Sequence, residues 1–113
     1  MNYFLITDMC HDGEYEYYDY VAVETKMTSK EVYDNKGFWE ECFLAWQFGW
    51  VEQVVDNDWW TNGRIVTIED VTEITKEQFK VLEDLIGGRS LEDIMEMGGT
   101  DWTPLSENEA HYG

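Results

Sequence analysis

The densest group of side chains that could bind a metal ion or take part in catalysis lies near the N-terminus, at Asp8, Cys10, His11 and Asp12. A zinc site normally needs four ligands, drawn from Cys-x2-4-Cys or His-x3-5-His pairs. No such pair accompanies this group, because the second histidine is His111. Cys10 and His11 are adjacent, and adjacent residues of a strand point to opposite faces, which disfavours a nucleophilic Cys–His pair. We expect a hairpin turn here, with no metal and no cofactor.

A second acidic run extends from residue 56 to residue 63 and reads Asp-Asn-Asp-Trp-Trp-Thr-Asn-Gly. It is similar in composition to a calcium-binding loop. It lacks the glycine required at the sixth position and the glutamate required at the twelfth, where Thr67 stands. Two tryptophans are unusual at a loop tip unless they pack or bind. We interpret the run as the end of a hairpin that exposes Trp59 and Trp60 as anchors.

No other spacing predicts catalysis. The pairs Gly87-Gly88 and Gly98-Gly99 lack the Gly-x4-Gly-Lys-Ser/Thr pattern of a phosphate-binding loop and are typical of helix ends. Two acids could converge as the carboxylate pair of a glycosidase, but no spacing favours one pair among the 25. We therefore predict a protein that is not an enzyme, and a small enzyme with acids converging near Asp8 stays as a third hypothesis.

The charge is the most informative property of the composition. The 25 Asp and Glu stand against seven Lys and Arg, for a formal net charge of −18 in 113 residues. Residues 1–24 hold six acids and no base, and residues 51–74 hold six acids and Arg64, so these two segments carry −11. Residues 25–50 carry only −1. Such self-repulsion destabilises a small domain, which indicates that the charge serves contact with another molecule.

The acidic segments have strand patterns, and this determines how their charges are spaced. Residues i and i+2 of a strand face one side, about 7 Å apart, and carboxylates so spaced can take the places of the phosphates of a nucleic acid. Tyrosines among them offer contact area at low entropic cost. The residues expected to contact a partner are Asp12, Glu14, Glu16, Tyr18, Asp19, Tyr20, Asp56, Asp58, Trp59, Trp60, Glu69 and Asp70.

Solubility and a halophilic origin are alternative causes of the charge. Net charge keeps proteins soluble, and halophily gives a similar composition without any acidic binding site. The observed charge exceeds the magnitude of about 2–8 that is usual for a soluble small domain. Three alanines and many large aromatic residues argue against halophily.

The first half of the chain is predicted to form a hairpin and a helix. Residues 3–9 and 14–24 have strand patterns joined by a turn at His11-Asp12-Gly13. A capping box from Thr28 to Glu31 begins the helix, whose apolar stripe is Val32, Trp39, Phe43, Trp46 and Trp50.

The middle of this helix is the most apolar part of the chain. Gly37 is expected to kink the helix or to split it in two. Between residues 38 and 50 the helix is apolar nearly all round, which is typical of a helix central in the core or shared with a partner.

The second half repeats the order of strands and helix. Strands are predicted at about 51–57 and 64–69 with Asn62-Gly63 in the loop between them, and 69–74 continues as an extended edge. A capping box from Thr75 to Gln78 begins a helix that ends at Gly87-Gly88, and residues 90–97 form a short helix that ends at Gly98-Gly99.

These elements predict an α+β fold in the order ββαββα, a single small domain with an antiparallel sheet packed on an aromatic-rich helix. The domain is expected to span residues 1–99. Residues 100–113 are expected to be a loosely ordered tail with Trp102 as its anchor. Cys10 and Cys42 are too few and too far apart for a disulfide framework, so we expect two buried thiols.

The expected function follows from charge and size. The chain is similar to the class of small acidic inhibitors that phages and other mobile elements direct against host defence, of the anti-CRISPR or anti-restriction type. That similarity implies a basic, nucleic-acid-binding host protein as partner and the host cytoplasm as location. Direct binding to nucleic acid or to a membrane is not expected, since both attract Lys and Arg. The alternative is an oligomeric accessory protein that dimerises through the helix at 38–50, with its charge serving solubility.

Overall fold

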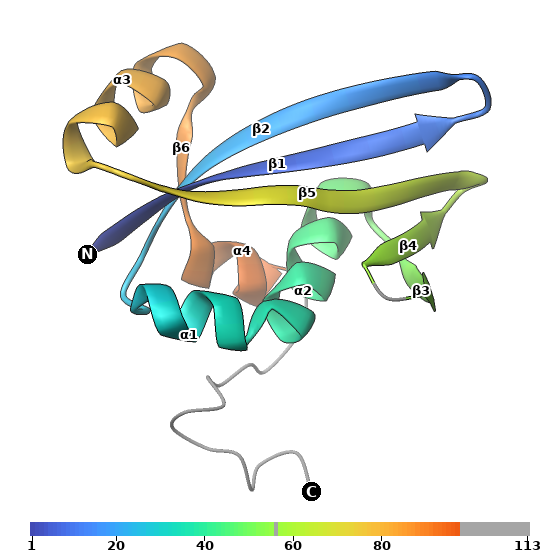
Figure 1. The fold of residues 1–113 in the computed structure, drawn as a ribbon, viewed down its shortest axis with the longest axis horizontal. Helices are drawn as coiled ribbons and strands as arrows, with labels where there is room; N and C mark the ends of the chain where they lie inside the picture. The colour runs from blue at the N-terminus through green and yellow to red at the C-terminus, as the bar shows by residue number, and fades with distance from the viewer. Residues whose placement is uncertain (56, 98–113) are drawn as a thin grey trace, which may run out of the picture.

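The computed structural model describes residues 1–55 and 57–97, which form a six-stranded sheet and four helices (Figure 1). In chain order the elements are β1 (Asn2–Asp12), β2 (Tyr15–Thr25), α1 (Ser29–Asp34), α2 (Lys36–Phe48), β3 (Glu52–Val55), β4 (Asp58–Thr61), β5 (Arg64–Ile74), α3 (Lys76–Ile86), β6 (Gly88–Ser90) and α4 (Leu91–Met97).

The strands lie in the order β3-β4-β5-β1-β2-β6. All neighbours are antiparallel except β2 and β6, which are parallel. The predicted α+β fold is confirmed, although the sheet is mixed rather than wholly antiparallel. The segment 69–74 was expected at an edge. It continues β5 and pairs with the first half of β1 on one side, whereas β4 pairs only with residues 64–67, so among the described strands its other side is an edge, as expected.

Two-residue turns determine the register of the β1–β2 and β4–β5 hairpins. Asp12 pairs with Tyr15, so the first turn lies at Gly13 and Glu14, beyond the predicted position, and Gly13 has a φ of 63°. The second turn uses Asn62 and Gly63, with φ values of 49° and 81°. Two positive φ angles match the right-handed twist of the strands in such a turn, which explains the choice of Asn-Gly.

The strand predicted at 51–57 is the shorter β3, and a further strand, β4, lies in the segment that was predicted to be a loop. β3 ends at Val55 and β4 begins at Asp58, and Asn57 between them has a left-handed φ of 70°. An asparagine tolerates this conformation better than most residues. The chain therefore reverses before the tryptophans, which places them on β4 rather than at a loop tip.

Both predicted capping boxes are confirmed. The Thr28 side chain caps the amide of Glu31 at the start of α1, and the Thr75 side chain caps the amide of Gln78 at the start of α3. The long first helix is split, as expected, but at Asn35 rather than at Gly37. The Asn35 side chain donates a 2.7 Å hydrogen bond to the carbonyl of Glu31, which ends α1.

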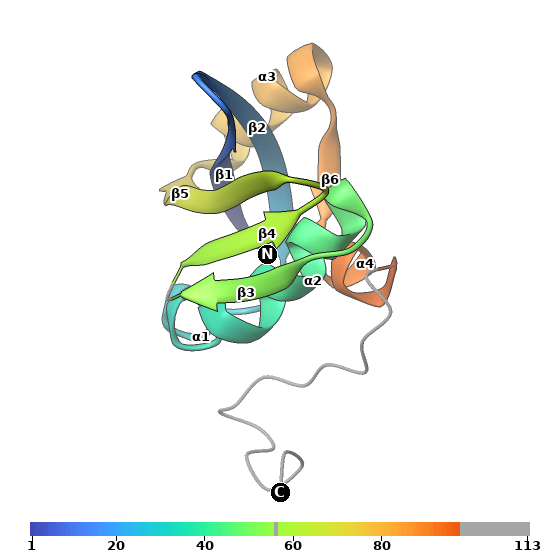
Figure 2. The same cartoon turned by 90° about the vertical axis from the view of Figure 1, so that its right-hand side faces the viewer.

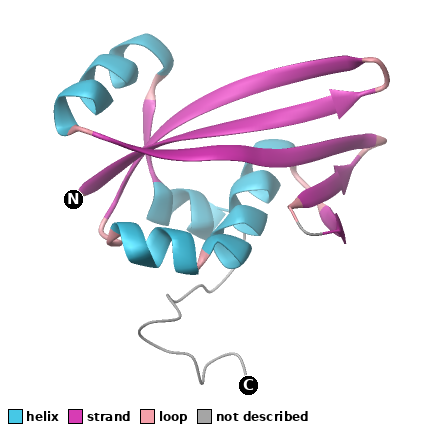
Figure 3. Ribbon diagram, viewed as in Figure 1, coloured by secondary structure: helices cyan, strands magenta, loops and turns pink. Residues whose placement is uncertain are grey.

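Helices cover both sides of the sheet, although unequally. Helices α1, α2 and α4 lie on one side, and α3 lies on the other side at the end where β1 begins (Figures 2 and 3). Phe79 on α3 packs its ring 5.0 Å from that of Tyr3 on β1, which holds α3 on the second side.

The core lies between the sheet and α2. Trp39, Phe43 and Leu44 on α2 are fully buried against Phe4 and Ile6 on β1. The apolar helix is thus central in the core, one of the two arrangements expected. Cys10 and Cys42 are buried thiols, as predicted. Within the described ranges no helix is long and apolar enough to cross a membrane. The predicted tail, the Gly98-Gly99 helix end and Asp56 lie outside the described residues.

Candidate functional site

The strand register divides the sheet into two faces. Residues directly opposite each other on neighbouring strands point to the same side. Phe4, Ile6, Asp8 and Cys10 on β1 point toward α2, and we refer to that side as the covered face. The other side is referred to as the open face. Helix α3 covers only one end of the open face. The rest of this face carries Glu16, Tyr18 and Tyr20 of β2, Asp58 and Trp60 of β4, and Glu69 and Asp70 of β5.

The β2 part of the open face combines carboxylate and phenol groups. The Tyr18 hydroxyl donates a 3.4 Å hydrogen bond to Glu16 Oε2, and His11 Nδ1 on β1 lies 3.6 Å from Glu16 Oε1. Tyr18 and Tyr20 expose 47% and 54% of their surface, so both rings are available for contact.

The β5 part of the open face begins at an irregularity in the sheet. Thr7 pairs with Asp70 and Asp8 pairs with Ile68, so Glu69 is an extra residue in a bulge. The negative charge of Glu16, and after burial that of Glu69, raises the pKa of Tyr18. Glu69 therefore acts electrostatically on Tyr18, although β1 runs between the two strands.

The β4 part of the open face carries an acid and an indole. Asp58 accepts a 2.8 Å hydrogen bond from the Thr67 hydroxyl. Trp60 is 38% exposed and meets the ring of Trp50, which is 57% exposed, with ring centroids 5.7 Å apart and planes at 84°. The two indoles thus form an exposed aromatic pair near the β3 edge of the sheet.

The remaining predicted contact residues lie elsewhere. Trp59 points to the covered face and is buried, with its Nε1 donating a 2.6 Å hydrogen bond to Glu40 Oε1, so the expectation of an exposed anchor at this residue is wrong. Alternation along β4 is the cause, since it turns adjacent tryptophans to opposite faces. Asp19 lies on the covered side of β2, opposite Asp8, and Asp12 and Glu14 lie at the hairpin tip.

Asp8 is the one buried acid of the N-terminal group. It has no exposed surface, and neither carboxylate oxygen has a hydrogen-bond partner. Burial raises the pKa of Asp8 to about 7, the charge of Asp19 adds to the shift, and the Gln47 amide opposes it. His11 lies on the opposite face from Asp8 and Cys10. In residues 1–55 and 57–97, no three His, Cys, Asp or Glu side chains gather as a metal-binding group.

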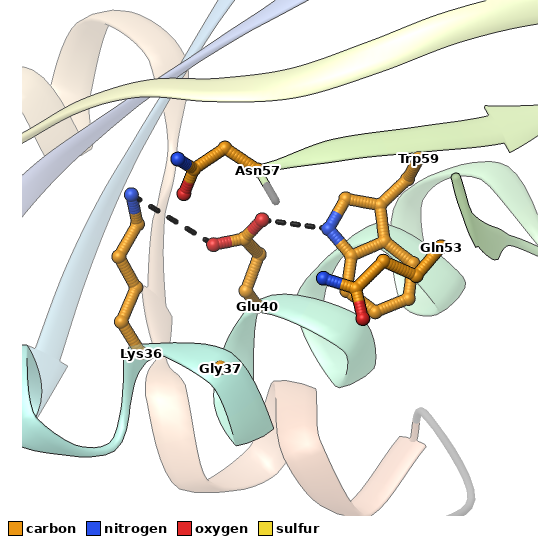
Figure 4. Close-up of a pocket in the computed structure, with 6 residues that line it drawn as sticks. All are labelled: Lys36, Gly37, Glu40, Gln53, Asn57 and Trp59. Carbon is orange, nitrogen blue, oxygen red and sulfur yellow. Dashed lines mark hydrogen bonds and ion pairs between the residues drawn. The ribbon is translucent and has the colours of Figure 1, made fainter. Parts of the chain in front are cut away.

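A cavity of about 340 Å³ lies between the start of α2 and strands β3 and β4 (Figure 4). Its polar lining includes Lys36, Glu40, Gln53 and Asn57. Lys36 Nζ lies 3.8 Å from Glu40 Oε2, and the other oxygen of Glu40 accepts the bond from Trp59. Burial raises the pKa of Glu40, and the hydrogen bond from Trp59 and the charge of Lys36 oppose the shift. These contacts join α2 to the β3–β4 hairpin, which gives Glu40 a structural role.

Two residues of the surface escaped the sequence analysis. Trp50 was assigned to the stripe of the helix, but α2 ends at Phe48, and Trp50 instead meets Trp60. Glu52 pairs with Trp60 across β3 and β4 and therefore shares its face. A usable signal was Gly49, whose φ of 92° ends the helix.

The open face is therefore the strongest candidate for a binding surface. It joins carboxylates and exposed rings from three strands, and none of its described strand residues is Lys or Arg. Comparison with protein-family models, with curated proteins and with solved structures finds no match for this chain.

Proposed function

We propose that this chain is a non-enzymatic inhibitor that presents its open face to the basic, nucleic-acid-binding surface of another protein and competes there with DNA or RNA. The observation that carries the proposal is the composition of that face. Carboxylates and exposed rings share the face on β2 and β4, β5 adds two carboxylates, and no Lys or Arg lies at a described strand position of this face.

The placement of the carboxylates supports the proposal. Glu16 pairs with His11 and Asp70 pairs with Thr7, so these two acids lie two strands and four residues apart, or roughly 17 Å by strand geometry. The negative charge is therefore spread over the open face, as the phosphates of a nucleic acid are spread along its backbone.

The charge of the whole chain adds a kinetic advantage. A net charge of −18 steers the protein toward a basic surface and speeds association, an effect that falls as salt rises. The size and charge of the chain, similar to those of inhibitors from phages and other mobile elements, favour a host defence or nucleic-acid-processing protein as the target. The host cytoplasm is then the site of action.

The alternative function, dimerisation through the aromatic helix, receives less support. Trp39 and Phe43 are fully buried in the core of their own chain, so they offer no surface to a second copy. The open face, in contrast, has exposed rings that none of the described helices covers.

A capture experiment tests the proposal. The immobilised chain is incubated with a cell lysate at low salt, and bound protein is then challenged with duplex DNA. We expect a nucleic-acid-binding protein to be retained and to be released by DNA. The variant Glu16→Gln/Glu69→Gln/Asp70→Asn should weaken retention about tenfold, since three contacts at about 0.5 kcal/mol each amount to that factor.

The matched control removes the same charge elsewhere. Glu77→Gln/Glu83→Gln/Asp84→Asn changes three exposed acids on α3 and should leave retention nearly unchanged. Equal losses in the two variants would mean that total charge, and not the open face, determines binding. Full retention by the open-face variant, or no effect of DNA, would refute the proposal.

A further inference from the structure

We infer that Trp50, Trp60 and Glu52 form a site for an arginine side chain of the basic partner. The inference rests on the proposed function and names the chemical group of the partner that one part of the surface would bind. It begins from the only part of the described sheet where two exposed tryptophan rings meet, with centroids 5.7 Å apart and planes at 84°.

The third member of the site supplies the negative charge. Glu52 is exposed and pairs with Trp60 across the β3–β4 ladder. Directly opposite residues share a face, with Cβ atoms about 4.5–5.5 Å apart. A cation over the indole of Trp60 would thus lie near this carboxylate. A guanidinium fits both groups, because it stacks flat on aromatic rings and donates paired hydrogen bonds to carboxylates, whereas an ammonium is a compact, strongly hydrated charge.

The chain already uses this chemistry on its other face. Its two arginines lie over aromatic rings, with Arg64 Cζ 5.9 Å from the ring centroid of Phe48 and Arg89 Cζ 5.5 Å from that of Trp46. In the described part of the chain, no Lys or Arg lies over Trp50 or Trp60. The exposed pair therefore offers aromatic rings like those that contact Arg64 and Arg89, but no described cation lies over them.

The position of the pair connects it to the proposed surface. Trp60 pairs with Ile65, and Ile65 pairs with His11, next to Glu16 on the open face. Arginine is also a principal residue of proteins that hold phosphates. A partner that docks on the acids of β2 and β5 could bring an arginine to the indoles on the β3 side.

Titration of the full chain with an oligoarginine peptide and an oligolysine peptide of equal length tests the site. We expect the arginine peptide to bind about two- to fivefold more tightly, the effect of an exposed cation–π contact. The indole N–H resonances of Trp50 and Trp60 should move more on its addition than those of the buried Trp39 and Trp59. This measurement needs no variant, so it does not depend on whether a substitution folds.

Variants then assign the preference to the indoles. Trp50→Leu/Trp60→Leu should bind both peptides equally. As the control, Tyr15→Leu/Tyr17→Leu removes an exposed aromatic pair, with centroids 6.4 Å apart, from the covered side of the hairpin and should keep the preference. Equal binding of the two peptides by the natural chain, or a preference that survives loss of the indoles, overturns the arginine site and leaves the proposed function standing. If neither peptide binds, both proposals fail.

Discussion

The covered and the open face belong to the same strands but differ in whether their charged groups and aromatic rings have partners within the chain. On the covered face Arg64 and Arg89 lie over rings, and Glu40 meets both Lys36 and the indole of Trp59. On the open face, beyond α3, the described strands present carboxylates, phenols and an indole without one Lys or Arg.

This difference separates side chains that stabilise the fold from side chains that are exposed and available for contact. The charged groups of Arg64, Arg89 and Glu40 on the covered face are matched within the chain, and such matching of buried groups favours a stable fold. Exposed groups on the open face contribute little to folding, since surface charges are well solvated. The described open face has no Lys or Arg, and a basic partner would supply such cations.

Loss of one ring from each face gives the largest expected contrast. Phe43 is fully buried, so Phe43→Ala should lower the free energy of unfolding by about 3–5 kcal/mol through lost burial and a cavity. Tyr20, at 54% exposure, should cost about 1 kcal/mol or less when changed to Ala. Urea denaturation followed by circular dichroism measures both values.

A milder change of the buried ring provides the control. Phe43→Leu keeps most of the apolar volume and should cost clearly less than Phe43→Ala. If Tyr20→Ala destabilised the chain as much as Phe43→Ala, the open face would be part of the core, and the separation of the two faces would be lost.

Asp8 is the exception on the covered face, and its behaviour with pH sharpens the comparison. Its folded pKa of about 7 lies above the ordinary value of 3.8, so between these values the folded chain binds more protons than the unfolded chain. Stability contributed by Asp8 is therefore lost as pH rises from about 4 to 7. Asp8→Asn should gain on the order of 3 kcal/mol at pH 8 relative to the natural chain, and little at pH 4.

The difference in the free energy of unfolding between Asp8→Asn and the natural chain isolates the effect of Asp8, because the other acids titrate in both. Thermal unfolding at several pH values in the same salt provides the measurement. Asp19→Asn is the companion variant, since it removes the second cause of the raised pKa and leaves burial, the first, in place. A constant difference between Asp8→Asn and the natural chain from pH 4 to 8 would contradict the assignment.

Local signals in the sequence predicted much of the fold. The two capping boxes, at Thr28 and Thr75, began helices where expected, because a cap depends only on residues three apart. Strand β4 was missed, since the chain reversal at Asn57, with its left-handed conformation, has no strong sequence signal. The place of β5 beside β1 depends on pairings between distant segments, and periodicity does not encode them.

The candidate binding surface was harder to predict for a related reason. Alternation placed Glu16, Tyr18 and Tyr20 on one face, and the register of β1 and β2 agrees with this. The same rule applied to β4 separates Trp59 from Trp60, but only once the start of the strand is known. The nearness of Trp50 to Trp60 depends on how the chain turns after α2, which the periodicity of the helix obscured.

The smallest expected effect is on the stability of the variant Glu16→Gln/Glu69→Gln/Asp70→Asn. Relief of repulsion should raise its free energy of unfolding by about 1 kcal/mol or less at low salt. This gain should vanish at 1 M salt, where the screening length is about 3 Å.

The same triple variant should change the titration of Tyr18. Since Glu16 is the first cause of the raised pKa of Tyr18 and Glu69 another, ultraviolet titration should find that pKa lower in the variant. Tyr18→Phe identifies the titrating phenol. An unchanged Tyr18 titration would show that these acids do not affect the tyrosine. Destabilisation of the variant by several kcal/mol would show that the three acids stabilise the fold, which would contradict the view that they are available to a partner.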